Sequence, residues 1–175
     1  MKKQSLLLTF SLLLLTSAAQ TVNLPAGYTP LEYIESTADG GQYIDTGYAP
    51  TLNTRLEATF IAHAKSRDWG VLFGVTGNDS SKDGILLRHY KYENGALSAW
   101  FCNDADIKTP WLVEEWVSVE LKAGSLKFTT EAGIWESSFK TTGTPCREPI
   151  YIFCGNNGGK AWRHQAMRLY SFKIY

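Results

Sequence analysis

A strict alternation of polar and apolar residues constrains the fold of this chain more than any other feature. From Asn53 to His63, alternate positions carry small or apolar side chains, namely Leu56, Ala58, Phe60 and Ala62. The positions between them carry Arg55, Glu57, Thr59 and Ile61. Successive side chains of a β-strand point to opposite faces of its sheet, so this segment is predicted as a half-buried strand.

Two shorter segments before it, 30–37 and 41–48, show the same alternation. Each contains a Tyr–Ile pair, at 33–34 and 43–44, and one member of each pair is expected to point inward and the other outward. β-Branched and aromatic residues dominate both segments, as a half-buried pleated surface prefers. We therefore expect two short strands joined by a glycine-containing turn at 38–41.

The remainder of the chain continues as short strand-like segments separated by turns rich in Gly, Asn and Asp. Strands are expected at 69–75, 85–92, 96–102, 111–122, 126–130, 134–140, 150–154 and 162–175. The segment 69–75 is apolar on both faces, which is typical of a central strand, and Glu93-Asn94-Gly95 is a hairpin signal. With no convincing helical pattern, the sequence predicts an all-β fold of two packed antiparallel sheets.

Three stretches carry a resemblance to a known superfamily. The first runs from Leu31 to Glu57 and includes LEYIEST and QYIDTGY; the second includes WVSVEL at 116–121; the third includes YIF at 151–153 and ends in MRLYSFKIY. In these stretches the chain resembles secreted bacterial domains of the concanavalin A-like lectin/glucanase superfamily, close to the laminin-G-like jelly rolls. The resemblance implies a lectin-like jelly-roll β-sandwich over residues 31–175.

The end of the chain departs from that family pattern. The pattern usually continues past Lys173-Ile174-Tyr175 with another strand segment and a tail. Two alternatives stay open, a naturally short form and a truncated reading frame, and the resemblance then implies a domain that lacks its last strand.

The first 19 residues have the layout of a secretory signal peptide. Lys2 and Lys3 precede an apolar run at 6–15 that is too short to span a bilayer, and small residues occupy 17–19. Cleavage there would leave an extended arm at 20–30 before the sandwich. We expect a secreted, periplasmic or cell-surface protein without a transmembrane segment after cleavage, rather than one with a retained anchor.

Charge and cysteine content narrow the classes of partner and compartment. The chain has 17 basic and 17 acidic residues and no net charge, which removes the electrostatic case for binding nucleic acid or an anionic membrane.

Its three cysteines are Cys102, Cys146 and Cys154. In an oxidising compartment, Cys146 or Cys102 is a candidate to pair with Cys154; the alternative is that all three are small buried residues.

The carboxylate pattern speaks against catalysis. A glycoside hydrolase needs two carboxyl groups that flank the sugar bond, and the glucanase relatives place an E-x-D-x-x-E pattern on one strand, which is absent here. Glu114 and Glu115 are adjacent, so on a strand they would face opposite sides. The expectation is a protein without enzymatic activity, and a hydrolase with a non-standard carboxylate pair is the least favoured alternative.

Two similar strand ends predict a candidate ligand site. Sugar recognition needs an aromatic plane to stack on the ring and short polar side chains to bind its hydroxyls. Segments 101–104 (FCND) and 153–157 (FCGNN) each place Asn or Asp just after Phe-Cys. If both strands run the same way, the two loops meet at one rim. The candidate ligand-binding residues are Trp100, Asn103, Asp104, Asn156, Asn157 and Trp162. The alternative is that the polar residues only form turns and the Trp rings fill the core.

The expected function is a secreted, non-catalytic module that binds carbohydrate. The alternative is an adhesion or structural domain whose partner is a cell-surface protein. No cofactor and no metal site are predicted, with calcium as an open alternative. Its oxygen ligands would come from Asp104 and Asp106, or from Asn78, Asp79 and Asp83.

Overall fold

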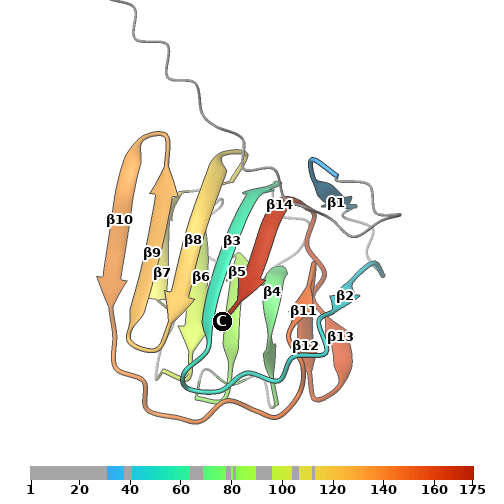
Figure 1. The fold of residues 1–175 in the computed structure, drawn as a ribbon, viewed down its shortest axis with the longest axis vertical. Coiled ribbons are helices and arrows are strands. Elements are labelled where there is room, and N and C mark those ends of the chain that lie inside the picture. The colour runs from blue at the N-terminus through green and yellow to red at the C-terminus, as the bar shows by residue number, and fades with distance from the viewer. Residues whose placement is uncertain are drawn as a thin grey trace, which may run out of the picture. The chain divides into compact units, whose positions relative to one another are not determined.

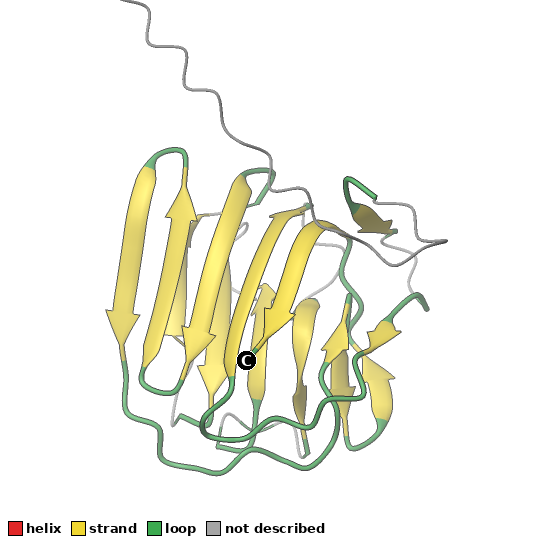
Figure 2. Ribbon diagram, viewed as in Figure 1, coloured by secondary structure: helices red, strands yellow, loops and turns green. Residues whose placement is uncertain are grey.

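The structure is a computed structural model. It describes residues 31–37, 41–63, 69–77, 80, 82–89, 96–103, 107–111 and 113–175. Every regular element in these ranges is a strand (Figure 2), and no helix among them is long and apolar enough to cross a membrane. The expected signal peptide, the arm at 20–30 and the hairpin turn at 93–95 lie outside the described residues.

The strands form two sheets, which appear as a front and a rear layer in Figure 1. The six-stranded sheet has the order β1 (Ile34–Ser36), β14 (Met167–Ile174), β3 (Arg55–Ala62), β8 (Trp116–Lys122), β9 (Ser125–Thr130) and β10 (Gly133–Ser138). The eight-stranded sheet has the order β13 (Lys160–Trp162), β12 (Gly155–Asn157), β4 (Val71–Thr76), β5 (Ile85–His89), β6 (Ala96–Phe101) and β7 (Ile107–Trp111), with β11 (Tyr151–Ile152) and β2 (Ile44–Asp45) attached. The all-β, two-sheet sandwich predicted from the sequence is confirmed.

The core lies between the two sheets. Strand β3 alternates between half-buried and buried positions along its whole length, as its sequence predicts. Its Phe60 ring meets Phe73 of β4 edge-on at 6.5 Å between centroids, and Phe73 also meets Phe172 of β14 at 5.1 Å. Edge-to-face contacts of this kind join the two sheets. All six residues of β4 are buried, which confirms it as a central strand.

The first two short strands differ from the sequence-based expectation. Strand β1 pairs with β14 in one sheet and β2 pairs with β11 in the other, so they do not lie side by side. Their Tyr–Ile pairs do not divide into buried and exposed members, because Tyr33, Ile34, Tyr43 and Ile44 are all 37–45% exposed. Both strands lie at the margins of their sheets.

Two other predicted boundaries are wrong. The strand expected at 111–122 begins only at Trp116, as β8, and Trp111 is the last residue of β7, which lies in the other sheet and occupies the segment between the strands expected at 96–102 and 111–122. The chain turns between β7 and β8 where Glu114 has a left-handed φ of 57°. The segment between the strands expected at 150–154 and 162–175 contains a further strand, β12, and the chain reverses just before it at Phe153, whose φ is 72°. Non-glycine residues seldom adopt this conformation, so sequence patterns alone give little sign of these turns.

Candidate functional site

The outward surface of the six-stranded sheet, here named the polar face, carries the side chains that alternate with the core residues. Strand pairing aligns these side chains into rows that cross the sheet. One row consists of hydroxyl groups from four neighbouring strands, Ser171 of β14, Thr59 of β3, Ser118 of β8 and Thr129 of β9. The hydroxyls of Thr59 and Ser118 share a hydrogen bond of 2.9 Å. We name this set the hydroxyl row.

A charged row lies next to the hydroxyl row, two residues along each strand. It runs across the sheet as Lys173, Glu57, Glu120, Lys127 and Glu136. Two carboxylates, Glu57 and Glu120, are direct partners across β3 and β8. Like charges placed opposite one another destabilise a sheet, so each of these carboxylates needs a compensating cation.

Those cations are supplied on the face itself. Arg55 lies 3.1 Å from Glu57, and Lys122 lies 2.7 Å from Glu120. The hydrogen bond from Lys122 lowers the pKa of the Glu120 carboxyl below its ordinary value, despite an opposing effect of partial burial. Glu120 is therefore ionised at neutral pH and presents acceptor oxygens only.

A groove of about 270 Å³ lies over these two rows. Its walls and floor are formed by Glu57, Ala58, Thr59, Ser118, Val119, Glu120, Lys127, Thr129, Ser171 and Lys173. The groove thus combines hydroxyl groups, carboxylates and ammonium groups over four adjacent strands. It offers donors and acceptors on a rigid sheet.

A bulge in β14 keeps the groove in register. Leu169 pairs with Phe60, and the next pair is Ser171 with Thr59, so Tyr170 is an extra residue in β14. If β14 had no bulge and Tyr170 paired with Thr59, Ser171 would pair with Ala58 and point into the core.

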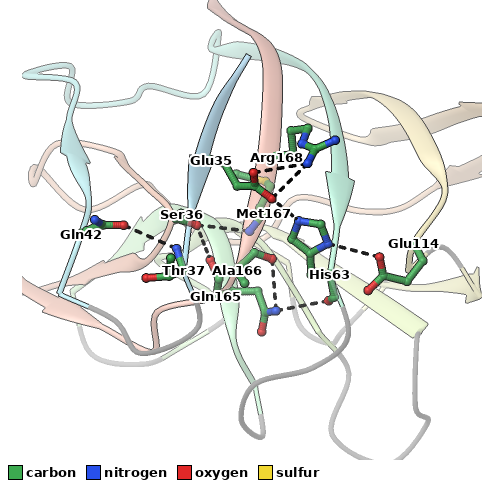
Figure 3. Close-up of polar contacts among 10 residues, drawn as sticks. All are labelled: Glu35, Ser36, Thr37, Gln42, His63, Glu114, Gln165, Ala166, Met167 and Arg168. Atoms are coloured by element: carbon green, nitrogen blue, oxygen red, sulfur yellow. Dashed lines mark hydrogen bonds and ion pairs between the residues drawn. The ribbon is translucent and has the colours of Figure 1, made fainter.

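A polar cluster lies at the end of β3, and Figure 3 shows its contacts. It consists of His63, Glu35, Glu114 and Arg168 and is here named the His63 cluster. His63 Nε2 is 2.9 Å from an oxygen of Glu35, and Nδ1 is 3.2 Å from an oxygen of Glu114. Glu35 also accepts hydrogen bonds from Arg168, at 3.3 and 3.4 Å. The His63 hydrogen bond is the largest cause that lowers the pKa of the Glu35 carboxyl. The cluster joins β1, the end of β3, β14 and the turn before β8.

Exposed aromatic side chains lie at both ends of β8. Trp116 begins the strand and is 44% exposed. At the opposite end, Tyr175 is 53% exposed, stacks under the Arg55 guanidinium at 4.2 Å and donates a hydrogen bond to Glu57. Each ring also lines a hollow of its own, of about 350 Å³ at Trp116 and about 450 Å³ at Tyr175.

The two predicted tryptophans lie on the other sheet. Trp100 is only 6% exposed and packs with Val71 and Leu86 on the outward side of the eight-stranded sheet. Trp162 is half-buried and packs against the same small cluster. The guanidinium of Arg88 lies 3.9 Å from the Trp100 ring centroid. The structure therefore brings the two rings into one cluster, in which Trp100 is a packing residue.

The predicted asparagines lie near one another but have structural hydrogen bonds. Four residues form one row across the eight-stranded sheet: Asn156 pairs with Val75, Val75 with Ile85, and Ile85 with Phe101. Asn157 follows Asn156 and Asn103 follows two residues after Phe101, so both also lie at this end of the sheet. The strands do not run the same way, because β11 is antiparallel to β4; the reversal at Phe153 brings β12 back parallel to it.

Hydrogen bonds hold two of these asparagines in place. Buried Asn103 accepts from the Phe101 amide at 2.8 Å. Buried Asn156 donates to Pro149 O and accepts from Gly159 N, both at 2.8 Å. Asn157 is half-buried in β12, and Asp104 lies outside the described residues. Ligand contact by this set stays a prediction.

The suggested calcium ligands are described only in part. Asn78, Asp79, Asp104 and Asp106 lie outside the described residues. Asp83 accepts a hydrogen bond of 2.9 Å from the Thr76 hydroxyl. In the described ranges, no group of three or more His, Cys, Asp or Glu side chains is arranged to hold a metal ion.

The three cysteines are free thiols in this structure. Burial raises the pKa of Cys102 to about 12 and that of Cys154 to about 11. Cys146 is half-buried, and its pKa is also raised, mainly by burial. Thiolate is the nucleophilic form, so these environments suit packing rather than reactivity.

Sequence reasoning missed the groove entirely. Its only local signal is the alternation of Thr and Ser with core residues in β3, β8 and β9. Such hydroxyls are ordinary on a solvated sheet, and their alignment depends on pairing between distant segments.

Comparisons with known proteins support the fold. No family model matches the chain, and no curated protein matches it in sequence. Among solved structures, the IT-sialidase CBM40 of Ruminococcus gnavus superposes with a TM-score of 0.55 at 14% identity, over 83% of this chain and 90% of that one. The same module bound to α2,3-sialyllactose gives 0.53 at 13% identity, with the same coverage.

A sialidase structure also contains a similar domain. The K499G mutant of NanB sialidase from Streptococcus pneumoniae superposes with a TM-score of 0.54 at 10% identity. The match covers 82% of this chain and 25% of the sialidase. At these identities the likeness shows the jelly-roll fold that the family resemblance implied, and no more.

Proposed function

We propose that this protein is a non-catalytic carbohydrate-binding module and that the sugar lies in the groove of the polar face. One observation carries the proposal: four hydroxyl groups in a row lie beside a row of charged side chains across one open groove. Sugars present closely spaced hydroxyls, which need donors and acceptors at matching intervals. Carboxylates accept such bonds, ammonium groups donate them, and Ser or Thr hydroxyls do both.

The similar structures favour the same function. The R. gnavus module is a carbohydrate-binding module, and one of its structures holds α2,3-sialyllactose. It matches this chain over nearly all of its own length, which suits a self-contained binding domain. At 13% identity, the sugar bound by that module does not identify the sugar bound here. The proposal therefore names only carbohydrate as the ligand class.

The hydrolase alternative has one supporting observation, because Glu57 and Glu120 face the same groove. A hydrolase needs one carboxyl group that is protonated at neutral pH, which an apolar environment achieves by raising its pKa. Lys122 instead lowers the pKa of Glu120, and Glu57 is bound by Arg55 and Tyr175. Both groups suit ligand binding better than acid catalysis.

The protein-adhesion alternative is less well supported. Such a site usually presents an exposed apolar patch, whereas eight of the ten residues that line this groove are polar or charged. We also propose that residues 1–19 are removed on secretion, so that the module acts outside the cytoplasm, where glycans are exposed.

A glycan array with the secreted form, residues 20–175, tests the function. We expect reproducible binding to one glycan class, lost in the double variant Thr59→Ala/Ser118→Ala. Ser138→Ala is the matched control, because this serine lies on β10 outside the groove. Asn157→Ala tests the rim predicted from the sequence. A blank array from folded protein would contradict the function, and loss of binding only in Asn157→Ala would move the site to that rim.

A further inference from the structure

We infer that the ligand is an uncharged, linear oligosaccharide that lies along β3 and β8 between Trp116 and Tyr175. This inference rests on the proposed function and specifies the form of its ligand. It follows from the position of three hollows, from the aromatic residues at the two ends, and from the pairing of charges between them.

The three hollows follow one another along β8, and β3 lines the first two of them. The hollow at Tyr175 includes Arg55 and Lys122. The groove begins with the next outward residues of β3 and β8, which are Glu57 and Glu120, and continues to Ser118. The third hollow begins at Trp116, the next outward residue of β8. Successive outward positions of β8 therefore line all three, as a ligand parallel to the strand requires.

The length of this path suits several sugar units. From Trp116 to Lys122 is six residue steps of β8, which span roughly 20 Å at about 3.3 Å per step. A single sugar would fill only the central groove. A chain would reach an aromatic ring at each end.

The aromatic rings supply stacking surfaces in those positions. Trp116 and Tyr175 are both large and well exposed, and Tyr175 is held in place by Arg55 on one side and by its hydrogen bond to Glu57. An apolar ring face is the surface on which the C–H side of a sugar packs. Around the hollow at Trp116, the side chains of Glu114, Glu115 and Glu131 can accept hydrogen bonds from hydroxyl groups.

Carboxylates along the central groove and the Tyr175 end are paired with cations of the protein itself, and the Trp116 end adds the acidic side chains of Glu115 and Glu131. Three pairs, Arg55–Glu57, Lys122–Glu120 and Lys127–Glu136, lie at 3.1, 2.7 and 3.1 Å. A face built from matched pairs attracts neither sign of charge strongly. An acidic sugar would also approach the adjacent carboxylates of Glu57 and Glu120. An uncharged ligand meets no such repulsion.

The test is a length series measured by calorimetry. The probes are β1,4-linked and β1,3-linked glucose oligomers and α1,6-linked mannose oligomers of two to six units, with α2,3-sialyllactose as the acidic arm. We expect affinity for one neutral series to rise at least tenfold from dimer to hexamer. Trp116→Ala and Tyr175→Ala should each lower hexamer affinity roughly tenfold and lower dimer affinity by a smaller factor. Ile134→Ala, exposed on the same face but outside the hollows, should change neither.

The outcomes separate the inference from the proposed function. Neutral binding with no dependence on length, or with hexamer affinity insensitive to both aromatic variants, would overturn the inference and leave a carbohydrate-binding module. Binding of the sialylated probe in preference to every neutral oligomer would do the same. Failure of all probes together with a blank glycan array would overturn the function itself.

Discussion

Nε2 of His63 lies 2.9 Å from a carboxylate oxygen of Glu35, and this contact ties the short edge strand β1 to the end of β3. Both ring nitrogens of His63 face carboxylates, because Nδ1 lies 3.2 Å from Glu114. Arg168 adds a cation beside Glu35, at 3.3 Å. These polar contacts help to hold β1 in place, because β1 itself buries little apolar surface.

Acid should loosen this cluster. The pKa of Glu35 is lowered in the folded protein, chiefly by the His63 hydrogen bond. Its stabilising contribution is therefore complete above the ordinary glutamate pKa of about 4.3 and is lost as pH falls through the lowered folded value. We expect Glu35→Gln to melt lower than wild type at pH 7 and to approach it near pH 3. Thermal melting from pH 7 to pH 3 measures this difference.

The control for this prediction is Glu32→Gln, which changes an exposed glutamate outside the cluster. It should follow wild type at every pH. A Glu35→Gln deficit that stays constant down to pH 3 would show that the carboxylate charge is not what stabilises the cluster.

Truncation of Trp100 should lower the free energy of unfolding much more than truncation of Trp116. Trp100 is 6% exposed in a packed cluster, whereas Trp116 is 44% exposed. Trp100→Ala should lower the free energy of unfolding by about 3–5 kcal/mol, the cost of a large cavity. Trp116→Ala should lower it by less than about 1 kcal/mol. Urea denaturation of both variants decides this, and a well-folded Trp100→Ala that has lost glycan binding would support the sequence-based site instead.

The thiols should be slow to react in the folded protein. The raised pKa values of Cys102 and Cys154, about 12 and about 11, leave almost no thiolate at pH 8. We expect half-buried Cys146 to be modified first by iodoacetamide, and all three to react quickly in denaturant. Mass spectrometry of the modified protein measures the order. Fewer than three reactive thiols in denaturant would reveal a disulfide and contradict the free-thiol state.

The sandwich could be predicted from the sequence because the patterns that identify its central strands each lie within a single segment. The alternation in β3 and the apolar run in β4 each report burial within one segment. The start of β8 at Trp116 rather than Trp111 follows a turn at Glu114, a residue of a type that rarely adopts the left-handed conformation. The apolar residues at 111–113, before that turn, therefore extended the predicted strand toward its N-terminal end.

The candidate site could not be predicted because it depends on register. Thr59 and Ser118 are 59 residues apart and become neighbours only through the pairing of β3 with β8. The bulge at Tyr170 then decides whether Ser171 joins them. Trp100 shows a second limit of local sequence. The outward side of its sheet is also packed, so the strand pattern around Trp100 does not tell whether the ring is buried or exposed to a ligand.

Gly74 should tolerate no side chain, for two separable reasons. It has a φ of 141°, and it lies in β4 opposite Leu86 on one side and Tyr151 and Gly155 on the other. A Cβ atom there would collide with the Leu86 Cβ and backbone. Because β4 is paired on both sides, it cannot move away. We expect Gly74→Ala to cost more than about 4 kcal/mol, beyond the usual range for one substitution.

Gly133 supplies the matched control, since its φ is 139° and a Cβ there would meet nothing within 4 Å. Gly133→Ala should therefore show the backbone strain alone, about 1–3 kcal/mol. Urea denaturation of the two variants, or the soluble yield if Gly74→Ala does not fold, measures the difference. Equal losses would show that strain at positive φ accounts for both, and that the close approach of β5 to β4 adds nothing.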